Sequence, residues 1–145
     1  MTTSIVAFVA VLGLLIFFHE LGHFLLARFF GVGVETFSLG YGTRLLGKTI
    51  GRTDYRISMV PIGGYCKMVG EEPGTEIDPE DVAVSFTHQH VMKRICIVVA
   101  GPIFNILLAV ILLFGLFQVT GLLIYTPSVG SVVEGSPAEA GGLEA

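Results

Sequence analysis

The stretch Ile16–Ala27, with the sequence IFFHELGHFLLA, places three ionisable side chains inside a run of apolar residues. It belongs to an apolar segment from Ile5 to Phe30, which as a helix would extend about 39 Å. That length exceeds the hydrocarbon core of a bilayer, about 30 Å thick. No Lys or Arg precedes the segment and no small-x-small cleavage site follows it. These features favour a transmembrane helix over the alternative of a cleaved signal peptide.

The composition of the whole chain agrees with a membrane location. Of 145 residues, 52% are hydrophobic and 14% are charged, whereas about a quarter are charged in globular proteins. A mean hydropathy of +0.79 is too high for a fold with a polar surface, and it also excludes intrinsic disorder. A net charge of −4 gives no indication of nucleic-acid binding. The two cysteines, Cys66 and Cys96, are too few for a disulfide framework or a cysteine-based zinc ribbon.

A second apolar segment, Ile95–Tyr125, contains no charged residue and predicts a second transmembrane helix. All eight Lys and Arg residues lie between Arg28 and Arg94. The positive-inside rule therefore places the connecting region in the cytoplasm and both termini outside it. We expect an α-helical integral membrane protein with four parts: residues 1–30, 31–94, 95–125 and 126–145. The last part is too short to bury a core of its own, so we interpret it as the start of a further domain.

The region between the two apolar segments contains the expected β-structure. Tyr55–Val60 and Tyr65–Val69 have the composition of strands, and Pro61–Gly64 between them has the composition of a turn. This pattern predicts a β-hairpin. Gly31–Gly51 is rich in glycine and receives no strand assignment, and the acidic segment Glu71–Asp81 is expected to be a solvated loop.

The ionisable cluster in the first helix has the spacing of a metal site. His19-Glu20-Leu21-Gly22-His23 matches H-E-x-x-H, in which residues four apart share one helix face and reach one zinc ion. Zinc lowers the pKa of a water molecule, and Glu20 is placed to take its proton as a general base. The alternative is a neutral cluster without metal, in which Glu20 pairs with one histidine. Ionisable groups inside a bilayer are costly and usually mark function, which favours the zinc site.

With these residues in place, the chain resembles the site-2 protease family of intramembrane zinc metalloproteases, most closely the regulator of sigma-E protease type. The resemblance implies two transmembrane helices and a cytoplasmic region whose β-hairpin dips into the membrane beside the metal. It also implies that the chain reaches the opening of an extracytoplasmic PDZ-like domain. Five motifs carry the resemblance: His19–Arg28, Phe37–Gly42, Tyr55–Met68, Ala100–Asn105 and Val129–Leu143.

The resemblance also implies where substrate binds. An open hairpin edge can hold an extended substrate through main-chain hydrogen bonds. Gly63 and Gly64 of the hairpin and Asn105 of the second helix are therefore candidate substrate-binding residues. The alternatives are a hairpin that rests on the bilayer surface, and an Asn105 that makes a helix–helix hydrogen bond.

One feature departs from the family pattern. The family's third zinc ligand is an aspartate in an L-D-G motif, and this sequence contains no Leu-Asp-Gly. His88 and His90 can complete a site in principle, although H-x-H before a membrane helix more often lies in the polar interface. We therefore expect a truncated, N-terminal portion of the enzyme.

The function expected from the resemblance is that of a zinc endopeptidase in the bacterial inner membrane. Its expected partners are the bilayer and membrane-anchored protein substrates, such as an anti-sigma factor in stress signalling, and no nucleic acid. The alternative is a non-catalytic membrane-embedded fragment or interaction protein that lacks the third ligand.

Overall fold

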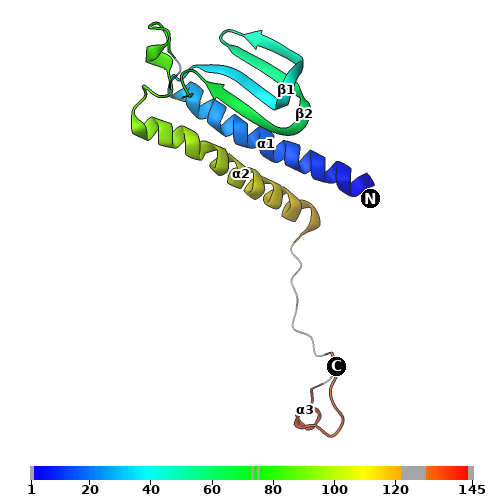
Figure 1. The fold of residues 1–145 in the computed structure, drawn as a ribbon. Coiled ribbons are helices and arrows are strands. Elements are labelled where there is room, and N and C mark those ends of the chain that lie inside the picture. Colours follow the sequence, from blue (N-terminus) through cyan, green and yellow to red (C-terminus); the bar gives the residue numbers. More distant parts are fainter. Residues whose placement is uncertain (1, 73, 75, 122–129, 144–145) are drawn as a thin grey trace. The chain divides into compact units, whose positions relative to one another are not determined.

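The structure, a computed structural model, describes residues 2–72, 74, 76–121 and 130–143. Its elements, in chain order, are α1 (Thr2–Phe29), β1 (Val34–Ile50), β2 (Thr53–Met68), the short 3-10 helix η1 (Val82–Val84), α2 (Val91–Thr120) and α3 (Pro137–Ala140) (Figure 1). The chain forms two compact units, Met1–Leu112 and Leu113–Ala145. The first unit contains all the candidate site residues.

Both long helices have the length and composition needed to cross a membrane. Their most apolar windows have mean hydropathies of 2.3 in α1 and 2.8 in α2, and little of either window is buried. Such an apolar outer surface fits contact with lipid better than contact with water. The helix α2 begins at Val91, before the apolar segment expected from Ile95. Helical hydrogen bonding does not depend on hydropathy, and the backbone N–H groups of Lys93 and Arg94 already donate to the carbonyl of His90.

The sheet consists of β1 and β2, which are antiparallel. The first half of β1 pairs with β2 on both of its sides: Phe37 is opposite Cys66 on one side and Tyr55 on the other. The second half of β1 pairs with the first half of β2, with Lys48 opposite Tyr55. Residues 64–68, 34–39, 54–57 and 46–50 therefore lie side by side in that order, and 64–68 form one edge.

The predicted hairpin is wrong in its pairing. Tyr55–Val60 and Tyr65–Val69 do not pair with each other, because β1 lies between them, and Pro61–Gly64 is a bend within β2. The glycine-rich segment supplies β1, which sequence patterning missed because glycine is unfavourable in strands. Glycine is required at Gly40, which has φ +88° and whose Cβ would lie 2.6 Å from the carbonyl oxygen of Val60.

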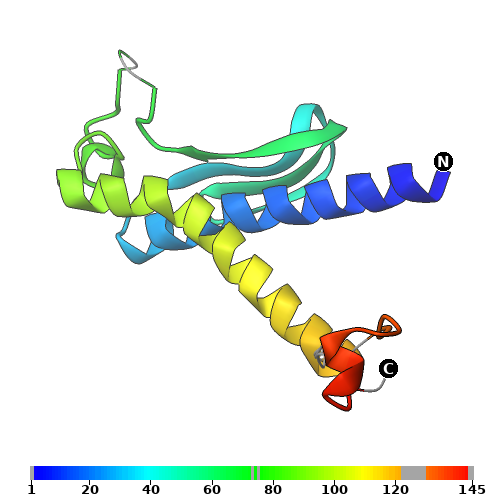
Figure 2. The same ribbon diagram turned by 90° about the horizontal axis from the view of Figure 1, so that it is seen from below.

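The buried core lies where the end of α1 meets the sheet and the start of α2. Phe37 is at its centre, with the rings of Phe24 and Tyr55 packed edge-on or tilted against it at 5.2 and 6.2 Å between centroids. In Figure 1, α1 lies between the sheet and the first part of α2. In the view from below, α1 lies in front of the sheet (Figure 2). This core fixes the last turns of α1, which carry the H-E-x-x-H motif. Its buried members are Ala27, Val32, Val34, Phe37, Cys66, Met68 and Ile97.

Candidate metal centre

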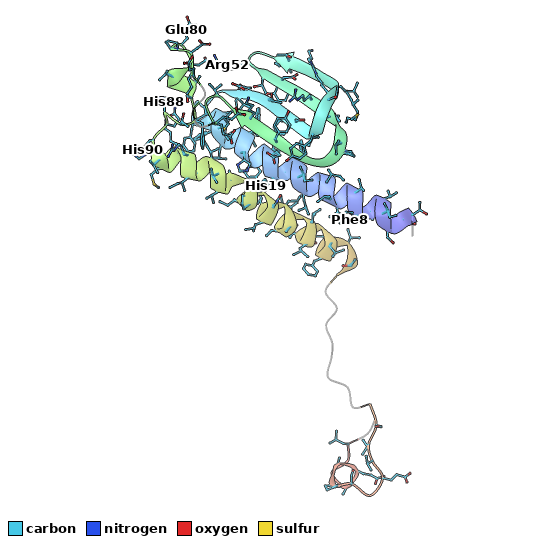
Figure 3. The ribbon with its side chains drawn as sticks, in the orientation of Figure 1. Phe8, His19, Arg52, Glu80, His88 and His90 are labelled. Carbon is cyan, nitrogen blue, oxygen red and sulfur yellow. The ribbon has the colours of Figure 1, made fainter. Side chains whose placement is uncertain are left out.

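The side chains of the two histidines of the motif lie close together and face α2. Their rings are 4.9 Å apart between centroids and inclined by 77°. His19 lies where α1 faces α2 (Figure 3). The facing residue of α2 is Gly101, where a Cβ atom would lie 2.5 Å from Nε2 of His23 and 2.7 Å from Nε2 of His19. Both Nε2 atoms therefore converge on one small space beside a residue that has no side chain.

The close approach of the two helices depends on a second glycine. A Cβ atom at Gly22 would lie 2.6 Å from the carbonyl oxygen of Ala100 and 3.0 Å from Cγ of Phe104. Small residues at a helix crossing allow backbones to approach closely. Gly22, between the two histidines in the sequence, thus permits α2 to reach them.

The histidine Nδ1 atoms show how the rings are oriented. Nδ1 of His23 lies 2.8 Å from the carbonyl oxygen of Ile97. A carbonyl only accepts, so this nitrogen carries the proton and donates it, and Nε2 of the neutral ring is left with a free lone pair. Zinc binds such a lone pair at about 2.0–2.1 Å, and its histidine ligands usually donate their other N–H in this way. Nε2 of His23 therefore presents a lone pair suited to zinc toward the space that it shares with Nε2 of His19.

Glu20 lies beside residues 64–68 at the sheet edge. The backbone N–H of Cys66 is directed at the Glu20 carboxylate. A Cβ atom at Gly64 would lie 3.3 Å from Cγ of Glu20 and 2.9 Å from Cγ2 of Ile16. Glu20 is thus held between the histidine pair and residues 64–68 of β2.

A cavity of about 340 Å³ opens beside these residues and brings most of the predicted site together. Among its lining residues are five of the six candidates from the sequence: His19, Glu20, Gly63, Gly64 and Asn105. The rest of the wall is Tyr41 from β1 and the apolar Leu12, Leu15 and Ile16 from α1. The sixth candidate, His23, lines a neighbouring cavity of about 310 Å³ together with Glu20, Cys66 and Glu71.

The structure places the other two histidines elsewhere. His88 and His90 lie near the start of α2, away from His19 (Figure 3). Nδ1 of His88 is 3.2 Å from Oγ of Ser85, and Nδ1 of His90 accepts the backbone N–H of Met92 at 3.2 Å. Across residues 2–72, 74, 76–121 and 130–143, no three His, Cys, Asp or Glu side chains form a metal-binding group.

Tyr41, Ile97 and Gly101 touch the site but were not among the candidate site residues, although Tyr41 and Gly101 lie in two of the motifs that carry the family resemblance. Ile97 and Gly101 could have been found from their spacing, because each is four residues from the next in the series Ile97, Gly101 and Asn105. Positions four apart share one face of a helix, so a backbone acceptor, a glycine and an amide line up on α2. For Tyr41 the only signal is its place in the motif Phe37–Gly42, and the fold of β1 brings it to the cavity.

Residues 7–140 match the family described as "Peptidase family M50". The chain belongs to peptidase family M50. Relatives of this M50 chain named "Putative zinc metalloprotease" occur in Brucella suis biovar 1 (38% identity over 151 residues), Ralstonia nicotianae (42% over 150) and Campylobacter jejuni (42% over 141). The matches cover 97%, 98% and 95% of this chain but 40%, 32% and 37% of those proteins. The M50 chain thus spans two fifths or less of the length of these relatives.

The family and the names of these relatives agree with the site geometry. The relatives are named zinc metalloproteases, and the His19–Glu20–His23 cluster of this chain is chemically suited to zinc. M50 includes the site-2 proteases, and the two apolar helices are consistent with a membrane protein of that family.

Proposed function

We propose that this M50 chain carries the metal-binding part of an intramembrane endopeptidase that hydrolyses peptide bonds in membrane-anchored proteins. The observation that carries the proposal is the convergence of two histidine Nε2 atoms beside Glu20 and a sheet edge. His19 and His23 would hold the zinc ion. When bound, zinc supplies Lewis acidity and a water molecule of lowered pKa.

Glu20 acts as the general base and then as the general acid. Glu20 lines both cavities, one together with His19 and the other together with His23. It takes a proton as water attacks the peptide carbonyl and gives a proton to the leaving amine. General acid–base catalysis of this kind contributes about 10²–10⁴-fold to a rate.

The substrate pairs with the sheet edge at residues 64–68. A transmembrane segment must leave its helical form before a peptide bond can be attacked, and an extended segment can add to an open edge as a further strand. Gly63 and Gly64 line the cavity, and the absence of their side chains leaves room for the ring of Tyr41 beside Gly63 and for Ile16 and Glu20 beside Gly64. The apolar Leu12, Leu15 and Ile16 in the wall suit the apolar side chains of a transmembrane segment.

The proposed setting is the bacterial inner membrane, with the connecting region in the cytoplasm and both termini outside it. The confinement of all eight basic residues to positions 28–94 supports this orientation. A sheet beside the metal at membrane depth is compatible with a bilayer where its backbone faces protein or a water-filled cavity. The substrate class is signalling proteins, such as an anti-sigma factor already trimmed outside the membrane. The PDZ-like opening from Val129 onward would screen them; 129 and 144–145 lie outside the described residues.

The test compares the parent protein, Glu20→Gln and the control Glu76→Gln on a reporter transmembrane substrate. Glu76 is an exposed acidic residue of the loop between β2 and η1. We expect cleavage by the parent and the control, and a loss of at least about a hundredfold in Glu20→Gln. Equal cleavage by all three proteins would contradict the proposed mechanism. A parent that binds the substrate without cleaving it would favour the alternative of a non-catalytic interaction protein.

A further inference from the structure

Both imidazole rings contact the same face of α2. Ile97, Gly101 and Asn105 follow each other at intervals of four residues, so they lie on one helix face. The Ile97 carbonyl accepts from Nδ1 of His23 at 2.8 Å, and Gly101 lies against both Nε2 atoms. The amide group of Asn105 lies 3.3 Å from Nδ1 of His19. In each histidine, Nδ1 thus contacts a residue of α2, and Nε2 faces the space beside Gly101.

The orientation of the Asn105 amide group determines which tautomer of His19 is stable. As placed, Nδ2 of Asn105 faces Nδ1 of His19, while Oδ1 is buried and has no hydrogen-bonding partner among the described residues. In this orientation Nδ1 of His19 must accept, which puts the ring proton on Nε2. A protonated Nε2 cannot bind a metal ion.

A half-turn of the amide resolves this conflict without changing the packing. Amide oxygen and nitrogen have nearly the same size, and their assignment follows from the hydrogen bonds they make. After the half-turn, Oδ1 of Asn105 accepts from Nδ1–H of His19, and Nε2 of His19 presents a lone pair as Nε2 of His23 does. The NH₂ group then takes the buried position of the oxygen that has no partner among the described residues.

We propose that Asn105 is a positioning residue whose amide oxygen holds His19 in the Nδ1–H tautomer, the form that binds metal through Nε2. It does for His19 what the Ile97 carbonyl does for His23. This inference rests on the proposed zinc site. Partners of this kind orient metal-binding histidines, and their loss typically costs about 10–100-fold in metal affinity. A simple helix–helix hydrogen bond would contribute to stability but would not select a tautomer.

The experiment measures the tautomers directly in the full chain, without metal. The chain is labelled with ¹⁵N-histidine in detergent micelles, and nitrogen chemical shifts identify the protonated nitrogen of each ring. His19→Gln and His23→Gln variants assign the signals. The test variants are Asn105→Leu, which removes the acceptor, and Asn105→Asp, which restores an oxygen. Gln118→Leu, which removes an exposed amide from the same helix, is the matched control.

We expect the parent and Gln118→Leu to hold both rings in the Nδ1–H form. In Asn105→Leu, the proton of His19 moves toward Nε2 while His23 is unchanged, and Asn105→Asp restores the parent pattern. Zinc affinity, measured by equilibrium dialysis, follows the tautomer: it falls about 10–100-fold in Asn105→Leu and recovers in Asn105→Asp.

Two outcomes would overturn the proposal. One is a parent chain in which His19 carries its proton on Nε2. The other is an Asn105→Leu variant that loses thermal stability but keeps the parent tautomer, which assigns Asn105 to helix packing alone. Because the tautomer is measured without metal or substrate, the result stands separately from the proposed hydrolysis. A chain with the expected tautomers that does not cleave substrate refutes the hydrolysis and not the role of Asn105.

Discussion

At the scale of single residues, the metal centre depends on the missing side chain of Gly101. Alanine at this position would place a methyl group 2.5 Å from Nε2 of His23 and 2.7 Å from Nε2 of His19, in the space that both nitrogens face. We expect Gly101→Ala to lose at least about tenfold in zinc affinity, even though alanine favours a helix over glycine by about 1 kcal/mol. Equilibrium dialysis against zinc measures the loss.

Gly115→Ala is the control for this substitution. It lies on the same helix, and a Cβ atom there would meet no described atom within 4 Å. We expect it to keep the parent affinity. Equal zinc binding by Gly101→Ala and Gly115→Ala would show that the ion does not occupy the space between the two nitrogens.

The thiol of Cys66 gives a second test at this scale. Burial raises its pKa from the ordinary 9.0 to about 12, and the negative charges of Glu20 and Glu71 act in the same direction. At neutral pH the folded chain then has about a thousandfold less thiolate at this position than an ordinary cysteine. In a Cys96→Ala background, we expect alkylation by iodoacetamide to keep rising with pH up to about 12. Mass spectrometry measures the rate, and a plateau near 9.0, as expected of the denatured chain, would contradict the burial of Cys66.

At the scale of the elements, a buried hydroxyl group adds a hydrogen bond between β1 and β2. Oγ1 of Thr53 is fully buried and donates to the carbonyl oxygen of Val34 at 2.8 Å. We expect Thr53→Val, which keeps the shape and loses the donor, to lower the free energy of unfolding by about 1 kcal/mol. Thr49→Val, at an exposed position of β1, serves as the control and should change little. Thermal unfolding in detergent compares the two, and equal stability would place the Thr53 hydroxyl in contact with water.

Among the elements, the H-E-x-x-H helix follows from the sequence and the strand pairing does not. The H-E-x-x-H helix was predictable because a helix has a fixed period, so His19 and His23 share a face whatever surrounds them. The pairing of the strands was not, since Phe37 has neighbours on both sides that are distant in the sequence. Bends at glycines such as Gly40 allow this arrangement, and they follow from tertiary contacts rather than local preference. The roles of Gly63 and Gly64 as substrate-binding residues stay predictions, although both line the cavity.

At the scale of the whole molecule, the distribution of charge predicts the orientation in the membrane. Cysteines introduced at Asp78, in the acidic loop, and at Gly130, after α2, are both exposed. In a variant without Cys66 and Cys96, we expect a membrane-impermeant maleimide to label residue 130 in intact spheroplasts. Residue 78 should be labelled only after the membrane is opened. The reverse pattern would invert the proposed topology.

The composition predicts the two apolar helices but not the contact between them. Two apolar helices of sufficient length follow directly from hydropathy, as α1 and α2 show. The contact between them does not, because every apolar face is equally suited to lipid. It depends on Gly22 and Gly101, whose importance becomes visible only when the two helices are packed together.

That contact gives the second helix a share in metal binding although it supplies no proposed ligand. The imidazoles are oriented by acceptors on α2, so the metal affinity of α1 depends on how completely the two helices are associated. By thermodynamic linkage the dependence is reciprocal: zinc at a hundredfold above its dissociation constant would strengthen the association by about 2.7 kcal/mol. Any lipid, substrate or force that separates the helices would then release the ion, and the ion would resist the separation. Metal binding would in this way stabilise the association of the two helices as well as supply the chemistry.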